Sequence, residues 1–454
     1  MKRIQAISVL DGRYHRHTKE LNRIFSEYGL IRHRVFVEIQ WLKFLLKELG
    51  LEPVTSEEIK KMDGIFSEFG VTDAEKIKEI EKQTNHDVKA VEYFIKQELM
   101  DRGLARFKEW VHFACTSDDI NNTAYALMVK EGRKILAEGI TSVVEKIESY
   151  ARKYKAVPMM SRTHGQPATP TTAGKELVNF AWRLRLELTS LKLLYVHAKM
   201  NGASGNFNAH HFVFPEIDWI GASEKFISGY LGLMPILYTT QINPNHYLAE
   251  LLHVLIRLAS TIIDFDRDMW GYISIGYFKQ KSIAGEVGSS TMPHKVNPID
   301  FENSEGNMGM AISMMEHLAV KLLNSRFQRD LTDSTVLRNL GAVWGYLTIG
   351  LKSTLKGLDK VSLNPEALEK DLDENPELLS EAIQTAMRVY NEENPYEALK
   401  HLTRGRRVRL EDIREFVDHL AKVPESVKSR MKQLTVREYT GLAEKLVDHY
   451  FTKI

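Results

Sequence analysis

The spacing of the prolines limits the folds open to this 454-residue chain more than any other feature. No proline occurs between Pro53 and Pro158, or between Pro298 and Pro365. A proline inside a helix costs about 3 kcal/mol, so long helices can form only in such proline-free runs. Strand patterns are sparse, and no fixed-period repeat is visible. The chain is therefore predicted to be all-α.

Five long helices are predicted in the middle of the chain. Between Lys175 and Asn201 there is neither glycine nor proline, and apolar residues recur at steps of three and four, the spacing of one helix face. We expect this helix to end near Gly202 and to be about 40 Å long at 1.5 Å per residue. Comparable runs predict four further helices over residues 118–155, 245–270, 300–324 and 334–358.

Several of these helices are apolar on more than one side. The helix at 300–324 contains Met308, Met310, Met314 and Met315 together with four aliphatic side chains. A helix that is apolar nearly all round must be buried on every side, which one five-helix bundle cannot achieve for each member. We therefore predict that copies of the chain associate through these helices. Glycines on the last helix fit either close backbone approach or tolerated weak positions: Gly341, Gly345 and Gly350.

Shorter helices are predicted on both sides of the long ones. Up to about Arg106 the patterns are short and amphipathic, with Gly50 and Gly70 as helix stops. Asn-Pro pairs begin at residues 364, 375 and 394, and this pair is a typical helix start. We predict three helical domains: 1–112, the long-helix bundle 113–360 and 361–454.

Charge and cysteine content exclude several protein classes. Lys and Arg number 61 against 60 Asp and Glu, without the basic excess of a nucleic-acid binder. The one cysteine, Cys115, permits no intrachain disulfide and favours a reducing compartment. No secretory signal is visible, and the apolar stretch Leu251–Ile263 is shorter than the about 20 residues that span a bilayer. We expect a cytoplasmic protein that binds neither membrane nor nucleic acid.

Common cofactor and metal motifs are missing. The sequence has no GxxxxGKS/T, no GxGxxG after a strand, no HExxH and no CxxC. Nucleotide hydrolysis, nicotinamide chemistry and zinc catalysis are thereby disfavoured. We expect acid/base catalysis with no cofactor and no metal.

Residues 281–298 separate two long helices and include two glycines, two prolines and four hydroxyl residues. A solvated linker is one interpretation, but connections between packed helices are usually about 2–8 residues long, which favours a functional loop. Beside Ser289 and Ser290, the side chains of Lys295 and Asn297 offer a cation and an amide to a carboxylate or oxyanion.

His164 is the strongest acid/base candidate. A lone histidine is more often structural, but His164 lies in a polar turn with Gly165 and Pro167 rather than on an apolar helix face. His86 is a second candidate, for which a structural hydrogen-bonding role fits equally.

Hydroxyl residues stand at two predicted helix starts, Thr116–Ser117 and Ser334–Thr335. Helix capping alone explains both pairs. Helix N-termini also bind anions. The first pair suits a carboxylate, and the second, flanked by Arg329 and Arg338, suits a phosphate.

One motif resembles a known family. Residues 288–298 read GSSTMPHKVNP, which resembles the GSSxMPxKxNP signature of the fumarase/aspartase superfamily. Within that superfamily the whole chain, from Asp11–Tyr14 through Gln328–Ser334 to the tail, is similar to the bacterial adenylosuccinate lyases. Three other segments follow the superfamily's order: Thr84–Asp87, Thr116–Ser117 and Ser161–Gln166.

The resemblance implies a homotetramer in which the central helices form one shared bundle and three subunits build each active site. It implies β-elimination of fumarate from adenylosuccinate, giving AMP, and from the succinylated aminoimidazole carboxamide ribotide (SAICAR), giving AICAR. Sister lyases that release fumarate from argininosuccinate, malate or aspartate are the nearest alternatives, and their substrates contain no phosphate. A silent helical scaffold is the alternative from another class.

The resemblance also implies residue roles. Ser289 would be the base, with Ser290 as its rival, and protonated His164 would donate to the departing nitrogen, with His86 as a weaker rival. The implied substrate-binding residues are Arg13, Tyr14, Asn85, His86, Asp87, Thr116, Ser117, Gln241, Lys295, Asn297, Asn303, Arg329, Ser334, Thr335 and Arg338.

Overall fold

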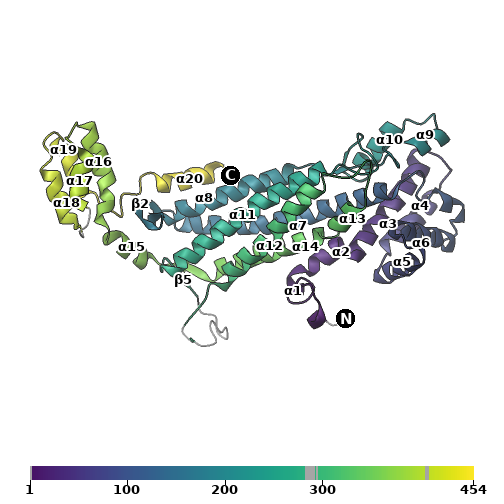
Figure 1. Cartoon of the computed structure of the whole chain (residues 1–454), viewed down its shortest axis with the longest axis horizontal. Coiled ribbons are helices and arrows are strands. Elements are labelled where there is room, and N and C mark those ends of the chain that lie inside the picture. The colour runs from purple at the N-terminus through teal and green to yellow at the C-terminus, as the bar shows by residue number, and fades with distance from the viewer. Residues whose placement is uncertain (1–2, 282–291, 293–294, 404–407, 454) are drawn as a thin grey trace. The chain divides into compact units, whose positions relative to one another are not determined.

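The computed structural model describes residues 3–281, 292, 295–403 and 408–453 (Figure 1). The chain divides into two compact units, each assembled from separate stretches. The described residues are mostly helical, as predicted, with three two-stranded sheets. Unit 1 comprises Met1–Ile140, Glu187–Ile263 and Ser304–Lys352, and unit 2 comprises Thr141–Leu186, Asp264–Asn303 and Ser353–Ile454.

Five long helices connect the shorter elements, and the boundaries between the units fall inside them. One of them contains the predicted core segment Leu251–Ile263, whose apolar side chains are mostly buried. In the described part of the chain, no helix is long and apolar enough to cross a membrane. The five are α7 (Ser117–Lys153), α8 (Ala173–Leu193), α11 (His246–Ser274), α12 (Ile299–Lys321) and α14 (Leu340–Asp359).

Two of the predicted long helices are shorter than expected. Helix α8 ends at Leu193 rather than near Gly202, and residues His197–Ala198 form strand β3, which pairs in parallel with β4 (Met234–Pro235). Val196, Ala198, Lys199 and Met200 are all buried, so burial here no longer follows the steps of three and four of one helix face. The prediction of a 40 Å helix was therefore wrong.

The predicted helix at 334–358 is broken in two. Helix α13 (Thr332–Leu337) ends before Arg338, and α14 begins at Leu340. Buried apolar residues continue on both sides of the break, at Leu337 and Leu340. The apolar periodicity could not reveal the interruption for this reason.

Close packing explains three of the four glycines of α14, those named in the sequence analysis. An added Cβ would lie 2.6 Å from Met308 at Gly350, 2.8 Å from Phe25 at Gly341 and 3.0 Å from Leu10 at Gly345. The interpretation as close-approach positions is confirmed within unit 1. In unit 2 aromatic rings also lie between the long helices, with Phe180 of α8 5.3 Å from Phe265 of α11, centroid to centroid.

The N-terminal part of unit 1 is a cluster of shorter helices around one apolar core. Gly50, with φ of 66°, follows the helical segment that ends at Glu48, as predicted. Gly70 was predicted to end a helix, but it stands at the start of one, where its N–H donates to Asp73 at 3.0 Å. The helices of unit 1 besides the long ones are α1 (His15–Thr18), α2 (Asn22–Phe25), α3 (Glu27–Lys43), α4 (Ser56–Ser67), α5 (Val71–Thr84), α6 (Asp87–Asp101), α9 (Asn208–Val213), α10 (Trp219–Lys225) and α13, with 3-10 turns at Arg3–Gln5, Lys19–Leu21 and Ala105–Trp110 and π turns at Phe44–Glu48 and Phe226–Tyr230.

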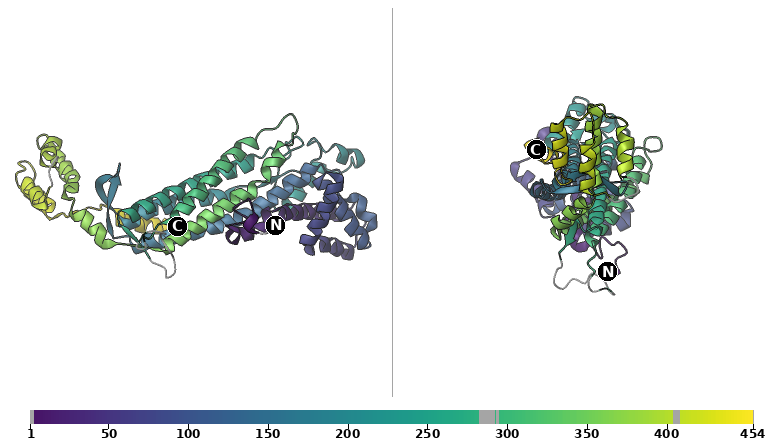
Figure 2. Two further views of the ribbon diagram at one scale, coloured as in Figure 1. Left: turned by 60° about the horizontal axis from the view of Figure 1, so that its bottom comes forward. Right: turned by 90° about the vertical axis from the view of Figure 1, so that its left-hand side faces the viewer.

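Unit 2 contains two small antiparallel sheets and the C-terminal helices. Strand β1 packs beside α15, as the left view of Figure 2 shows. The elements are β1 (Pro158–Thr163) paired with β2 (Gln166–Thr172), β5 (Phe278–Gln280) paired with β6 (Val361–Leu363), α15 (Pro365–Asp373), a 3-10 turn (Pro376–Leu379), α16 (Ser380–Val389), α17 (Pro395–Thr403), α18 (Leu410–Asp418), α19 (Glu425–Gln433) and α20 (Ala443–Lys453).

All three Asn-Pro pairs start helical segments, as predicted, with proline at the first helical position. The first two asparagines do not cap through their side chains. Asn364 donates its amide to the carbonyl of Gly276 at 2.9 Å, and Asn375 donates to the carbonyl of Asp371 at 2.7 Å. These asparagines anchor the helix starts to neighbouring backbone instead.

Candidate active site

In unit 1, one group of predicted site residues lies against α7. Arg338 and Arg34 both donate to Asp87 Oδ2, at 2.9 and 2.7 Å, and Arg34 Nε donates to Asn121 Oδ1 of α7 at 2.8 Å. Burial alone would raise the pKa of Asp87, but the Arg34 guanidinium outweighs it and holds the pKa below its ordinary value. Asp87 is thus a fixed, ionised acceptor.

The segment before α6 is shaped by local hydrogen bonds. Asn85 ends α5 in the left-handed region, with φ of 53°. His86 Nδ1 accepts the N–H of Lys89 at 3.1 Å and so caps α6, while its side chain stays exposed. The structural hydrogen-bonding role, one of the two interpretations of His86, is confirmed, because its Nδ1 accepts this capping hydrogen bond.

A second group of site residues lies at the start of α7. Arg329 Nη1 donates to Gln241 Oε1 at 3.2 Å, and Arg329 acts electrostatically on Asp118, the neighbour of Ser117. Burial raises the pKa of Asp118 to about 7, although the charges of Lys199 and Arg329 act in the opposite direction. The Ser117, Gln241 and Arg329 segments, which are distant in the sequence, therefore lie together at the start of α7.

The Ser334–Thr335 pair does not begin a helix. Helix α13 begins at Thr332, after Leu331, which makes no side-chain cap hydrogen bond; the N–H of Thr332 donates to Asp330 Oδ1 at 2.8 Å. The N–H of Ser334 donates to Asp333 Oδ1 at 2.6 Å. The prediction that a helix starts at residue 334 was therefore wrong, because the helix begins two residues earlier, at Thr332.

Arg13 and Tyr14 lie just before α1. The Arg13 guanidinium is 5.8 Å from the centroid of the Tyr14 ring. The nearby Asp11 lines a cavity of about 340 Å³ together with Glu27 and Arg338. This cavity places the N-terminal segment close to the Arg338 group.

In unit 2, His164 occupies the tip of the β1–β2 hairpin. His164 and Gly165 form a two-residue turn with φ of 55° and 74°, the left-handed pair typical of tight hairpins. The His164 side chain is exposed, whereas Met160 at the base of β1 is buried in the core of the C-terminal helices. The predicted polar turn is confirmed, but the hairpin that presents it was not expected.

The loop residues predicted to hold a carboxylate are also in unit 2. Lys295 is exposed, and its N–H donates to the carbonyl of Met292 at 3.0 Å. Asn303 on α12 donates its amide to Ser353 Oγ of α14 at 2.7 Å, and Asn297 is half-buried. Ser289 and Ser290 lie outside the described residues, as does most of the predicted loop.

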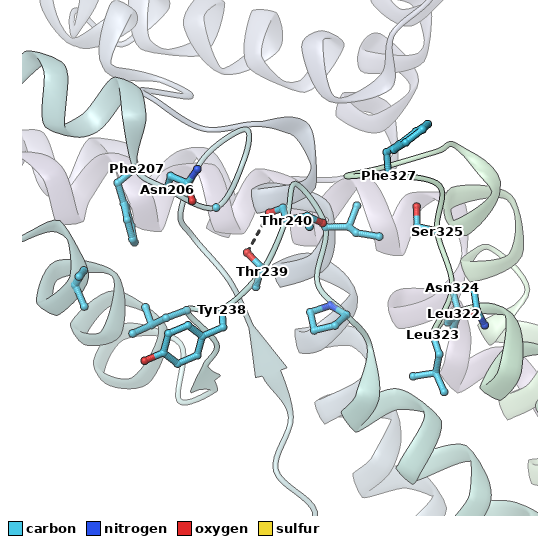
Figure 3. A pocket seen from close by; sticks show the side chains of 15 residues that line it. Asn206, Phe207, Tyr238, Thr239, Thr240, Leu322, Leu323, Asn324, Ser325 and Phe327 are labelled. Carbon is cyan, nitrogen blue, oxygen red and sulfur yellow. Dashed lines mark hydrogen bonds between the residues drawn. The ribbon is translucent and has the colours of Figure 1, made fainter.

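A cavity of about 880 Å³ lies beside the Gln241 segment in unit 1 (Figure 3). Its lining includes Tyr238, Thr239 and Thr240 from one segment and Phe327 from another. The Tyr238 and Phe327 rings are 93% and 95% exposed. This cavity was not predictable from the sequence, because most of its lining lies outside the helices, in segments that show no periodic pattern.

The chain matches two known protein families. Residues 12–313 match a family described as Lyase, and residues 325–440 match one described as Adenylosuccinate lyase C-terminal. The chain is 51% identical to the adenylosuccinate lyase of Vibrio cholerae and 50% identical to that of Escherichia coli, each over 98% of both chains. It is 49% identical to the adenylosuccinate lyase of Legionella pneumophila over the same share.

Two solved structures share the fold at low sequence identity. A fumarate lyase from Mesorhizobium sp. BNC1 aligns with a TM-score of 0.79 at 16% identity, over 96% of this chain and 98% of the other. A 3-carboxy-cis,cis-muconate lactonizing enzyme from Pseudomonas putida aligns with a TM-score of 0.76 at 16% identity, over 96% of both chains. At this identity the likeness concerns the fold alone.

Proposed function

The chain belongs to the adenylosuccinate lyase family of carbon–nitrogen lyases in purine biosynthesis, and from this premise we propose how its residues release fumarate from adenylosuccinate. The observation that supports the proposal most is the identity of about one half over 98% of the chain. The C-terminal family match, 325–440, includes the predicted phosphate ligands Arg329, Ser334 and Arg338. A phosphate site separates adenylosuccinate from the phosphate-free substrates of the sister lyases.

The elimination needs a base and an acid on two atoms of the substrate. We assign Ser289 as the base that removes the proton from the carbon next to the carboxylate. The electron pair forms the carbon–carbon double bond as the carbon–nitrogen bond breaks, and protonated His164 gives its proton to the departing nitrogen. The products are fumarate and AMP, or AICAR when SAICAR is the substrate.

Stabilisation of the carbanion is the hardest demand of this reaction. Proton loss beside a carboxylate leaves an aci-carboxylate with extra negative charge, which requires cations and donors already in place. Lys295 and Asn297 supply a cation and an amide from one short segment. Asn303 lies further along the same chain segment on α12, and its amide is already fixed by Ser353.

Binding of the nucleotide end is assigned to unit 1. Arg329, Ser334, Thr335 and Arg338, with Arg13 and Tyr14, would hold the phosphate through charge-assisted hydrogen bonds. The remaining residues line the rest of the substrate: Asn85, His86, Asp87, Thr116, Ser117 and Gln241. SAICAR contains the same ribose phosphate and succinyl groups, so the same residues would serve both substrates.

We also propose the homotetramer with shared active sites and the three-domain division 1–112, 113–360 and 361–454. The long helices leave large apolar side chains in contact with solvent in a single chain, among them Leu193 (71% exposed) and Val320 (64%). Exposed apolar surface on this scale is typical of an interface. A second copy of the chain that packs on these helices would also supply residues that surround the exposed His164.

The function is tested by incubating the pure protein with adenylosuccinate and following the loss of its ultraviolet absorbance. Turnover of adenylosuccinate and not of argininosuccinate, malate or aspartate is expected. No turnover at micromolar enzyme would contradict the function and favour the silent scaffold. Ser289→Ala should abolish turnover and leave the oligomer intact, whereas surviving activity would reject Ser289 as the base.

Site sharing has its own experiment. Inactive His164→Ala and Ser289→Ala proteins are mixed after reversible dissociation and allowed to reassemble. Some mixed oligomers should then contain sites with both intact residues, so activity should return. No regained activity after verified mixing would count against sharing.

A further inference from the structure

Six polar side chains lie almost completely buried beneath the Thr116–Ser117 turn in unit 1. We call this cluster the polar hub. Each member is at most 7% exposed. Burial of charges and amides is unfavourable unless every group is paired, so a cluster of this kind calls for a physical explanation. The polar hub consists of Asp118, Asp119, Asn122, Lys199, Asn201 and Asn243.

Asp119 is the centre of the polar hub. Its Oδ1 lies 3.0 Å from Lys199 Nζ and accepts the N–H of Asn201 at 3.1 Å. Its Oδ2 accepts the N–H of Thr116 at 2.8 Å and that of Gly202 at 3.2 Å. One carboxylate therefore fixes the Thr116 turn to the segment that follows β3.

The Gln241 segment is fixed to the polar hub on both sides of Gln241. On one side, Asn201 donates its amide to Thr239 Oγ1 at 2.8 Å. On the other, Asn243 donates its backbone N–H to Asp118 Oδ2 at 3.3 Å. Gln241 itself is not in the polar hub and is left to accept from Arg329.

The Arg329 segment is joined to the Gln241 segment by a second contact. Thr240 Oγ1 donates to the carbonyl of Gln328 at 2.9 Å, one residue before Arg329. Thr240 is exposed and lies at the cavity rim beside Thr239 (Figure 3). The chain of contacts therefore runs from the buried Asp119 to the half-buried Arg329.

We propose that the polar hub holds Thr116–Ser117, Gln241 and Arg329 in their substrate-binding arrangement before substrate arrives, with Asp119, Lys199 and Thr240 as positioning residues. This inference rests on the proposed function, because these three segments are the ones assigned to substrate. Groups that are already ordered lose little conformational freedom on binding, which strengthens binding without any new contact. The competing explanation is that the polar hub stabilises the fold and has no effect on binding.

Thr240→Val is the sharpest test. It removes only the hydroxyl, on an exposed side chain, so folding should be unaffected. We expect KM for adenylosuccinate to rise by about 3- to 10-fold, the value of one hydrogen bond, with kcat and the melting temperature unchanged. The matched control is Thr385→Val on α16, where the hydroxyl donates to the carbonyl of Glu381 at 2.8 Å, and KM should not change.

Asp119→Asn extends the test to the centre of the polar hub. We expect the inhibition constant of AMP to rise by at least the factor seen for Thr240→Val. If instead both variants only lower the melting temperature, or lower kcat with unchanged KM, the positioning role is wrong. If Asp119→Asn does not fold, Thr240→Val alone decides. If the wild-type protein turns over adenylosuccinate, the proposed function stands whatever these variants show.

Discussion

The candidate site has two parts that are held in place by different means. In unit 1 the predicted binding residues are fixed by side-chain contacts, through the polar hub and through the Arg34–Asp87 pair. In unit 2 His164 lies in a left-handed backbone turn at the tip of a hairpin, and the hairpin is held through Met160 and through the contact of Arg162 with Asp371. Substitutions in unit 1 should therefore disturb substrate binding, and substitutions at the hairpin tip of unit 2 should disturb the proposed proton transfer, independently of each other.

Removal of the acid should give the largest effect. His164→Asn keeps the hairpin, because Asn-Gly is a favoured pair for a tight turn with two positive φ values. It removes the proposed proton donor, so kcat should fall by about 10²- to 10⁴-fold while KM and the melting temperature change little. Steady-state kinetics with adenylosuccinate gives both constants.

The control for this variant is His211→Asn, an exposed histidine on α9. It should leave kcat unchanged. A fall of kcat in the control, or wild-type kcat in His164→Asn, would show that proton transfer does not depend on the hairpin tip.

Loss of an arginine from unit 1 should affect binding rather than turnover. Arg329→Met removes a charged donor of the proposed phosphate site, and such hydrogen bonds are worth about 1.5–3 kcal/mol, so KM should rise about 10- to 100-fold. Inhibition by AMP should weaken by the same factor. Inhibition by fumarate, which has no phosphate, should not change.

Arg326→Met is the matched control, since Arg326 stands three residues earlier and its side chain is 78% exposed. Its KM should equal that of the wild type. Equal weakening of AMP and fumarate inhibition in Arg329→Met would argue that Arg329 does not bind the phosphate.

The buried acid of the polar hub predicts a pH dependence of stability. Burial raises the pKa of Asp118 from 3.8 to about 7, so between these values the native protein keeps a proton that the unfolded chain has lost. The contribution to stability is complete below pH 3.8 and is lost as the pH rises through 7. Asp118→Asn resembles the protonated acid and does not titrate.

The urea midpoint of Asp118→Asn should therefore fall less than that of the wild type between about pH 4 and pH 7, the window that the two pKa values define. Asp101→Asn, at an exposed position on α6, should behave like the wild type. Parallel curves for all three proteins would show that Asp118 does not titrate in this window.

The turn that presents His164 should show the smallest effect. At Gly165, with φ of 74°, an added Cβ meets nothing within 4 Å, so Gly165→Ala introduces backbone strain and no clash. We expect a loss of about 1 kcal/mol in the free energy of unfolding, measured in denaturant. Gly271→Ala on α11 is also unobstructed but helical, and it should not destabilise. An unchanged Gly165→Ala would mean that the hairpin tolerates a side chain there.

The long helices were predictable from the sequence, and their ends were not. Proline-free runs and apolar steps depend on residues close together in the chain, so α7, α11 and α12 were predicted within a few residues. The end of α8 depends on the pairing of β3 with a strand at Met234, and local periodicity does not report such a partner.

The same limit applies to the candidate site. Motifs identified His164 and Arg329 as candidates but could not show how either is held. Lys199 was included in a predicted helix, whereas its partner Asp119 belongs to a different one. Two short sequence signals did exist: a lysine among apolar residues at 196–200, and two adjacent aspartates at the start of α7.

The polar hub also has a consequence for the order of folding. Its longest-range hydrogen bonds join residues that are between 77 and 125 positions apart in the sequence. The entropy lost in closing such long loops must be offset before these contacts form, so they are expected to form late. The long helices can therefore form before the chain acquires affinity for its substrate, and AMP added during refolding should bind only in the last kinetic phase.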